Sequence, residues 1–226
     1  MEEFIKEHLA HGTIVPSKSP QACRFFFIGK KDGKLRPCQD YHPLNSKTIK
    51  NAYPLPLIPL LLNKLCSAKY FTKIDIRWGY NNILIHPDDQ WKAAFITTSG
   101  LYEPVVMFFG LCNSPATFQS YMNHIFQDQI DEGWMVVYMD DILIFSSDLE
   151  THHQCTRIIL QTMKEKHLFL KPTKCSFDKE EIDFLGMIVK HSVVAMDPAK
   201  LKGITKWSTP QKLRDVCTFI SFCNFY

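Results

Sequence analysis

The sequence predicts an α+β fold in which helices pack against one face of an antiparallel sheet. In the middle of the chain, short apolar, β-prone runs alternate with segments of helical periodicity, in the order strand, helix, strand, strand, helix, strand. The composition agrees with this fold class. A chain of 226 residues with 46% apolar and 22% charged residues is typical of globular proteins and is long enough to bury a core.

Composition and charge exclude several classes of protein. No apolar run reaches the roughly 18 residues that span a bilayer, and the acidic start lacks the order of a signal peptide, so we expect an intracellular chain with no membrane partner. The eight cysteines occur singly, which favours free thiols. Residues 18–50 and 190–226 are basic and the remainder is acidic. This pattern is typical either of solvated faces or of basic surfaces that bind phosphate backbones beside metal-binding carboxylates.

The N-terminal part of the chain predicts a helix, a hairpin and a second helix. Glu2–Ala10 is a helix candidate. Arg24–Gly29 and Leu35–Tyr41 flank a turn signal rich in lysine, which indicates a hairpin with a basic tip. Beyond the extended stretch Pro54–Leu57, apolar residues recur at i, i+3, i+4 and i+7, as in a helix with one buried face; they are Ile58, Leu61, Leu62 and Leu65.

Strands and a helix follow in the next segment. Tyr70–Ile76 reads as a strand that carries Asp75 near its end, and Ala93–Thr98 reads as another strand. Ser114 and Pro115 predict a helix start, with a side-chain cap followed by a first-turn proline. The apolar stripe of this helix consists of Phe118, Met122, Ile125 and Phe126.

The C-terminal half predicts a second hairpin and more helices. Met135–Tyr138 and Ile142–Phe145 are apolar, β-rich runs that flank Asp140 and Asp141, so the two carboxylates should lie at a hairpin tip. The remaining expected elements are a helix over His152–His167, a strand over Phe184–Val189, and helices that open at Asp197-Pro198 and at Thr209-Pro210.

The three acids Asp75, Asp140 and Asp141 suggest a metal site. An Asp-Asp pair in a turn is ordinary by itself. If the strand that ends in Asp75 neighbours the hairpin, however, the acids converge, and two carboxylates about 4 Å apart repel by roughly 4 kcal/mol at an effective dielectric constant of about 20. Such a cluster needs a cation or a raised pKa. Carboxylates together with substrate phosphates are the usual ligands of Mg²⁺, and two such ions serve phosphoryl transfer.

A series of motifs identifies a family that this sequence resembles. Tyr138-Met139-Asp140-Asp141 is similar to the Y-x-D-D motif of reverse transcriptases. The chain as a whole resembles the reverse transcriptase domain of gypsy-type (Metaviridae) long-terminal-repeat retrotransposon polyproteins. The segments that carry the resemblance follow in the order of the family, and they are Leu35–Asn45, Tyr53–Pro56, Ala68–Ile76, Phe109–Gln119, Val137–Ser146 and Phe184–Gly186.

The resemblance implies a right-hand polymerase fold with fingers, palm and the start of a thumb. Residues 1–52 would be partial fingers, and residues 53–100 would be palm with the Asp75 motif. Residues 101–190 would be palm with the Tyr-Met-Asp-Asp hairpin and the primer grip, and residues 191–226 a truncated thumb.

The implied activity is RNA-directed DNA polymerisation, in which a primer 3′-hydroxyl attacks the α-phosphate of a deoxynucleoside triphosphate. By motif position, Asp75, Asp140 and Asp141 would be catalytic and would bind two Mg²⁺ ions, with Mn²⁺ as a possible substitute. The backbone carbonyl of Ile76 would complete the metal site.

Further residues acquire roles by the same resemblance. Tyr80 matches the bulky residue that excludes a ribose 2′-hydroxyl. The expected nucleotide-binding residues are Lys30, Lys31, Arg36, Arg77, Tyr80, Phe109, Gly110 and Met139. The expected primer- or template-binding residues are Tyr138, Leu185, Gly186, Lys212 and Arg214.

The implied partners are an RNA template, a DNA or RNA primer and deoxynucleoside triphosphates. A parent polyprotein would also contain ribonuclease H and integrase parts. Copying would take place in the cytoplasm, in a cytoplasmic virus-like particle or in the nucleus.

Departures from the family pattern keep an alternative open. Cations that are frequent in the family are replaced here by His42, Leu84, Ile96 and Thr98, and Phe108 replaces a proline. The chain could therefore be a decayed retrotransposon remnant with at most nucleic-acid binding. Another palm-type nucleotidyltransferase, such as a nucleotide cyclase, would leave Tyr80 and the ordered motifs unexplained.

Overall fold

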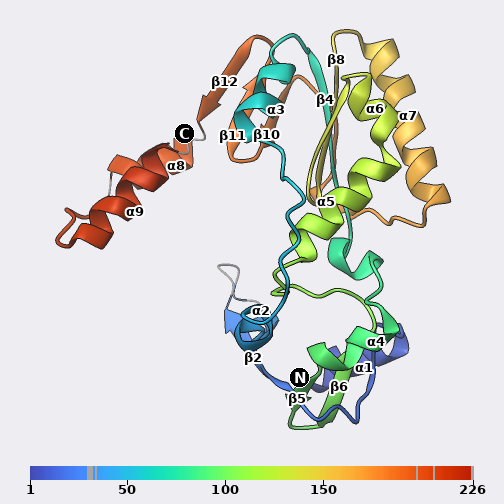
Figure 1. Cartoon of the computed structure of the whole chain (residues 1–226). Helices are drawn as coiled ribbons and strands as arrows, with labels where there is room; N and C mark the ends of the chain where they lie inside the picture. Colours follow the sequence, from blue (N-terminus) through green and yellow to red (C-terminus); the bar gives the residue numbers. More distant parts are fainter. Residues whose placement is uncertain (30–32, 34, 197, 206, 225–226) are drawn as a thin grey trace.

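The computed structural model describes residues 1–29, 33, 35–196, 198–205 and 207–224. Figure 1 shows an N-terminal unit, a larger central unit and a C-terminal helical arm. The extended stretch before helix α3 (Ile58–Leu65) is one of the segments that connect the first two units. Lys30 and Lys31, at the tip of the expected basic hairpin, lie outside the described residues.

The N-terminal unit is built on a five-stranded sheet in the order β1-β6-β5-β2-β3. Strands β2 and β3 form the expected antiparallel hairpin, and β2 also pairs in parallel with β5. The core of this unit contains Ile5 of α1 together with Tyr41 and Phe95. Its elements are α1 (Glu2–Ala10), β1 (Ile14–Pro16), β2 (Cys23–Gly29), β3 (Leu35–Gln39), α2 (His42–Asn45), α4 (Pro87–Gln90), the 3₁₀ turn Trp91–Ala93, β5 (Phe95–Thr97) and β6 (Gly100–Pro104).

The sheet pairing places residues 93–100 differently from the motif-based segment 53–100. Because β5 pairs with β2 and β6 and the Phe95 ring packs near those of Phe25 and Tyr102, this stretch belongs with the N-terminal sheet. This pairing joins segments that are far apart in the sequence, so local periodicity does not predict it.

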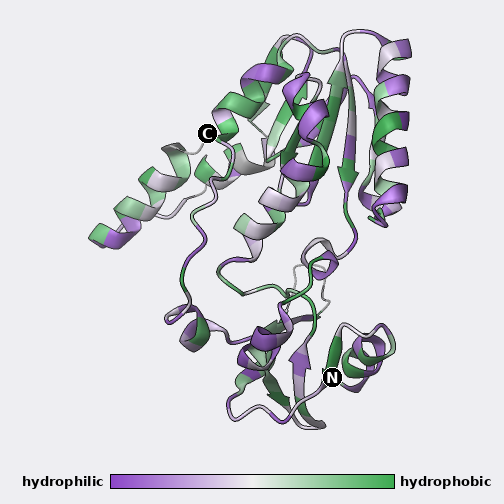
Figure 2. Cartoon of the chain, turned by 45° about the vertical axis from the view of Figure 1, so that its right-hand side comes forward, coloured by the Kyte–Doolittle hydropathy of each residue, from purple (hydrophilic) through white to green (hydrophobic). Residues whose placement is uncertain are grey.

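The central unit is built on a four-stranded antiparallel sheet in the order β7-β8-β4-β9. In Figure 2 its strands are largely green, whereas the neighbouring long helix α7 interleaves purple with green. The elements are β4 (Tyr70–Asp75), the 3₁₀ turn Gly79–Asn82, α5 (Ser114–Ile125), α6 (Gln127–Asp131), β7 (Met135–Tyr138), β8 (Asp141–Ser146), α7 (Leu149–Glu165), the 3₁₀ turn Pro172–Lys174 and β9 (Ser176–Lys179).

Both faces of the central sheet are covered. On one face, Phe118 of α5 and Ile159 of α7 pack against Ile74 and its neighbours. On the other face, Leu65 of α3 and Phe184 pack against Phe71. The prediction of helices on one face only is therefore wrong for α3, whose apolar stripe finds a partner on the opposite face.

Two predicted helix starts differ in detail from the structure. Ser114 does not cap α5; its hydroxyl is buried and donates to the carbonyl of Phe108, while Pro115 occupies the first turn as expected. Helix α9 (Leu213–Asn224) begins after Thr209-Pro210, because the Asp215 carboxylate accepts hydrogen bonds from the backbone N–H groups of Gln211 and Lys212.

The expected strand over Phe184–Val189 is instead a hairpin. Leu185 and Gly186 have φ values of 51° and 79°, as a two-residue type I′ turn requires. The last elements are β10 (Glu181–Phe184), β11 (Met187–Lys190), β12 (Val193–Met196), α8 (Pro198–Thr205) and α9, of which the strands form a three-stranded antiparallel sheet. Within the described part of the chain, no helix has the length and apolar character to cross a membrane.

Candidate active site

Three aspartates gather at one end of the central sheet. The register of β4 and β8 pairs Tyr70 with Ser146 at one end and Asp75 with Asp141 at the other. Directly opposed residues of an antiparallel pair have their side chains on the same face, about 5 Å apart at Cβ. Asp140 lies beside them, in the tight turn between β7 and β8, and its carbonyl accepts a hydrogen bond from the N–H of Ile76 at 3.4 Å.

The turn that carries Asp140 is held by a buried glutamine. Met139 has a φ of 54°, a conformation that L residues rarely adopt and that needs support from its surroundings. The Gln119 side chain, fully buried in α5, accepts from the N–H of Met139 at 2.7 Å and donates to the carbonyl of Val137 at 3.1 Å. Gln119 ends one of the family motifs, but no local pattern in the sequence assigns it a physical role.

Electrostatics at the turn favour a neutralising cation. Burial raises the pKa of the Asp140 carboxyl, and the negative charges of Asp141 and Asp75 raise it further. The positive charge of Lys174 lowers the pKa of Asp140. Loss of water and like-charge repulsion therefore both act on the carboxylate that the sequence predicts to bind metal.

Two lysines that sequence reasoning missed pair with the other two carboxylates. Nζ of Lys174 lies 2.8 Å from Oδ2 of Asp75, and Nζ of Lys73 lies 3.4 Å from Oδ1 of Asp141. The hydrogen bond to Asp75 raises the pKa of Lys174. The sequence offered only one signal for Lys73: residues 73 and 75 share a face of the same strand.

The donor set fits a hard divalent cation. Carboxylate oxygens are the ligands that Mg²⁺ prefers. In the described part of the chain, no three His, Cys, Asp or Glu side chains are grouped closely enough to hold an ion as they stand. The Asp75 and Asp141 carboxylates face lysine ammonium groups instead, so a metal ion would have to replace those contacts.

Three packed aromatic side chains lie next to the aspartates. Tyr80 is 9% exposed, and its ring meets that of Phe109 at 4.8 Å and that of Phe118 at 5.6 Å. The Tyr80 hydroxyl donates to Sδ of Met139 at 3.6 Å, which links it to the acidic turn. Burial raises the pKa of this phenol, so it remains a donor. A Cβ at Gly79 would lie 3.2 Å from the ring of Phe118 and 3.5 Å from Cβ of Asp140, which explains the glycine.

The other predicted nucleotide-binding residues are less closely grouped. The Arg77 guanidinium lies 4.3 Å from the centre of the Trp78 ring, and Phe109 is largely exposed beside Tyr80. Gly110 adopts a φ of 98° against Tyr41. Arg36 lies exposed on β3 of the N-terminal sheet, and no described contact joins it to the aspartates.

Of the predicted primer-binding residues, one group lies near the acids. Tyr138 pairs with Asp141, and the Lys73 ammonium donates to the carbonyl of Asp183, two residues before Leu185. Lys73 thus links the hairpin that carries Leu185 and Gly186 to strand β4. Lys212 and Arg214 lie exposed at the start of α9, and no contact among the described residues brings them to the aspartates.

Comparison with known proteins agrees with this geometry. Residues 28–189 match the family model described as "Reverse transcriptase (RNA-dependent DNA polymerase)". The chain is 33% identical over 225 residues to the Transposon Tf2-3 polyprotein of Schizosaccharomyces pombe, a match that covers 100% of this chain and 17% of the polyprotein. It is 36% identical over 231 residues to the Retrovirus-related Pol polyprotein from transposon 297 of Drosophila melanogaster, covering 100% and 22% respectively. The chain thus spans about a fifth of the length of these curated relatives.

Solved structures share the fold. A foamy viral protease-reverse transcriptase in complex with double-stranded DNA superposes with a TM-score of 0.91 at 22% identity, over 99% of this chain and 39% of the other. The foamy viral protein in complex with an RNA/DNA hybrid gives a TM-score of 0.84 at 21% identity, over 99% of this chain and 30% of the other. The right-hand polymerase fold expected from the motifs is confirmed, and the retrotransposon relatives agree with the gypsy-type resemblance. The chain belongs to the reverse transcriptase (RNA-dependent DNA polymerase) family.

Proposed function

We propose that this chain adds deoxynucleotides to a DNA or RNA primer that is paired with an RNA template. The observation that carries the proposal is the register of β4 and β8, which sets Asp75 opposite Asp141 with Asp140 in the adjoining turn. Three carboxylates at the end of one sheet suit the handling of phosphates through divalent cations.

In this proposal, Asp75, Asp140 and Asp141 would hold two Mg²⁺ ions, for which Mn²⁺ could substitute, and the carbonyl of Ile76 would assist. When bound, the ions supply positive charge to the phosphate oxygens of the reacting groups. The chain itself contributes orientation. Gln119 fixes the turn that presents Asp140, and the buried Tyr80 ring would exclude a ribose 2′-hydroxyl by its bulk.

The remaining residues would bind substrate and nucleic acid. Arg77, Phe109, Gly110 and Met139 adjoin the nucleotide position, and Lys30, Lys31 and Arg36 would approach its triphosphate from the fingers hairpin. Tyr138, Leu185 and Gly186 would contact the primer, and Lys212 and Arg214 would follow the duplex through its phosphates. We assign the five-stranded sheet, β5 and β6 included, to the fingers, the central sheet to the palm, and α8 and α9 to the thumb.

The longer relatives suggest that this chain functions inside a polyprotein. We propose that ribonuclease H and integrase parts accompany it there, and that copying takes place in the cytoplasm, in a virus-like particle or in the nucleus. A match to 17% of the Tf2-3 polyprotein leaves room for such parts.

Primer extension on an RNA template tests the proposal. We expect product with Mg²⁺ or Mn²⁺, and at least a thousandfold loss of rate in Asp140→Asn. Asp128→Asn, an exposed aspartate of α6, serves as the matched control and should retain full activity.

An inactive remnant is the competing hypothesis. Leu84 and Ile96 stand where the family often has cations. Both are exposed, at 72% and 55%, so these two surface positions carry apolar side chains instead of positive charges. Absence of product with either metal, while the purified chain still binds a primed template, would establish the remnant instead.

A further inference from the structure

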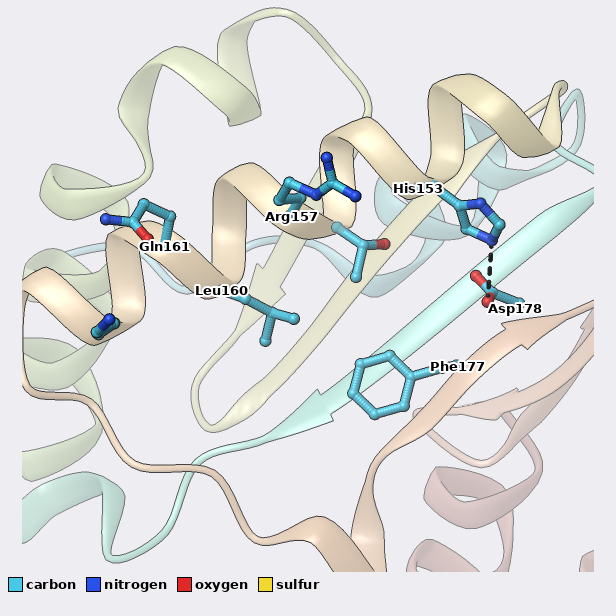
Figure 3. Close-up of a pocket in the computed structure, with 8 residues that line it drawn as sticks. His153, Arg157, Leu160, Gln161, Phe177 and Asp178 are labelled. Carbon is cyan, nitrogen blue, oxygen red and sulfur yellow. Dashed lines mark hydrogen bonds and ion pairs between the residues drawn. The ribbon is translucent and has the colours of Figure 1, made fainter.

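An open groove of about 390 Å³ runs between α7 and β9. Figure 3 shows its walls, with His153, Arg157 and Leu160 on the helix and with Phe177 and Asp178 on the strand. This volume lies at the lower end of the range typical of small-ligand sites.

The groove is separate from the aspartate turn. The N–H of Asp178 donates to Oγ1 of Thr72, whose side chain faces α7. Side chains alternate along a strand, so Lys73 and Asp75 point to the opposite face of the sheet. A ligand in the groove would therefore not share the site proposed for nucleotide addition.

The charges that line the groove favour an anion. Arg157 and Lys164 are exposed on α7, and among the described residues neither has an ion-pair or side-chain hydrogen-bond partner. Asp178 is the one acidic residue of the lining, and its Oδ2 lies 3.1 Å from Nε2 of His153. Arg157 and Lys164 lie about two turns apart on the same side of the helix, and both side-chain types bind the oxygens of phosphate groups.

A second observation points to a ligand rather than to a bare charged surface. Thr156 lies between His153 and Arg157 on α7 and is only 8% exposed. Among the described residues its Oγ1 has no hydrogen-bond partner. Buried hydroxyls are normally paired, so this group needs a donor or acceptor from the groove. The Phe177 ring is 41% exposed and faces the helix beside Leu160, which leaves an apolar surface for a planar group.

We propose that the groove between α7 and β9 binds a nucleotide unit, with its phosphate at Arg157 and Lys164 and its base against Phe177. Cations interleaved with an exposed aromatic ring are the combination that holds single nucleotides and single strands without reading their sequence. The unit comes either from a free nucleotide or from a single-stranded nucleic acid.

Binding of two ligands to the full chain separates these sources. Adenosine 5′-monophosphate and fluorescein-labelled hexadeoxyadenylate are titrated in EDTA, which removes metal-dependent binding at the aspartates. Adenosine monophosphate should shift the methyl NMR signals of Leu160. A single strand that binds at least tenfold more tightly than the mononucleotide identifies the single strand as the source, and similar affinities identify the free nucleotide.

Variants locate the site. Arg157→Gln/Lys164→Gln should weaken binding of both ligands at least fivefold, and Phe177→Leu, which keeps an apolar side chain, at least threefold. Lys166→Gln removes a neighbouring exposed lysine outside the groove lining and should change affinity less than twofold. The proposal is overturned if neither ligand binds, if the groove variants bind as the unmodified chain does, or if hexaglutamate displaces both ligands and binds Phe177→Leu undiminished. The last result would identify an acidic peptide as the partner.

Discussion

Nζ of Lys174 lies 2.8 Å from Oδ2 of Asp75, at the strand end where we propose a divalent cation. Lys174 approaches from the 3₁₀ turn before β9, and the backbone there is tied to the same strand end, since the N–H of Lys171 donates to the carbonyl of Asp75 at 3.0 Å. The ammonium group therefore occupies a position in which it competes with a metal ion for the carboxylate.

Replacing Lys174 should strengthen metal binding. In Lys174→Met the Asp75 carboxylate loses its competing cation. The Lys174 side chain is half exposed although Asp75 is nearly buried, and pairs with a solvent-exposed ammonium contribute up to about 1 kcal/mol. We therefore expect Mn²⁺ to bind roughly two- to fivefold more tightly. Calorimetric titration with Mn²⁺ measures the change. Lys171→Met, a nearby exposed lysine, should bind Mn²⁺ as the unmodified chain does, and unchanged or weaker binding in Lys174→Met would contradict the competition.

Gln119 should be needed for both stability and activity. Gln119→Leu keeps the apolar volume but leaves the N–H of Met139 and the carbonyl of Val137 without their partner. Two unpaired groups of this kind cost about 2 to 6 kcal/mol in the free energy of unfolding, measured by urea denaturation. Primer extension should slow at least tenfold under conditions where the variant is folded, because Asp140 loses its support.

The same substitution at a surface glutamine shows whether the effect depends on the buried hydrogen bonds of Gln119. Gln127 is exposed on α6, and within the described part of the chain its side chain bonds only to Asp131, so Gln127→Leu should change stability by less than about 0.5 kcal/mol. A folded Gln119→Leu protein with full activity would show that the turn does not depend on this side chain.

Tyr80 should determine the preference for deoxynucleotides. Removal of the ring in Tyr80→Ala opens the space between Phe109 and Phe118, so a ribose 2′-hydroxyl is no longer excluded. The ratio of kcat/KM for deoxynucleotides to that for ribonucleotides should fall at least tenfold. Tyr80→Phe keeps the ring and loses only the hydrogen bond to Met139, so its ratio should remain within threefold. Equal ratios in the two variants would exclude the steric role.

How far the sequence predicts this structure depends on the range of the interactions. The apolar runs around Asp140 and the period of α3 and α7 are local patterns, and they predict these elements correctly. The partner of β5 and the face that α3 covers depend on contacts between distant segments, and no local pattern reports them.

The same distinction holds within the candidate site. The three aspartates are recognisable because motif and strand periodicity agree. Lys174 stands 99 residues from Asp75, and Gln119 stands 20 residues from Met139. Their roles arise only when the chain is folded.

His152 connects three elements of the central unit. It is fully buried on α7, and its Nε2 lies 2.8 Å from Oγ1 of Thr72 on β4. Its Nδ1 lies 3.1 Å from Oγ of Ser146, at the end of β8. His152 therefore lies in the interior, because the first turns of α7 lie against the sheet.

Stability should fall on acidification because of this histidine. Burial lowers the pKa of His152 below its usual 6.5, the adjacent His153 lowers it further, and Asp178 partly opposes both. Below about pH 6.5 this imidazole binds a proton in the unfolded chain but stays neutral in the folded chain. Its contribution therefore lowers the free energy of unfolding by at most about 1.4 kcal/mol per pH unit. His152→Asn should be less stable at pH 7.5 and should show a flatter dependence between pH 7 and 5 in urea denaturation. A residual slope remains from His8, whose pKa burial also lowers. His153→Asn, at a half-exposed position, should keep most of the slope, and an unchanged slope in His152→Asn would assign the acid sensitivity to other groups.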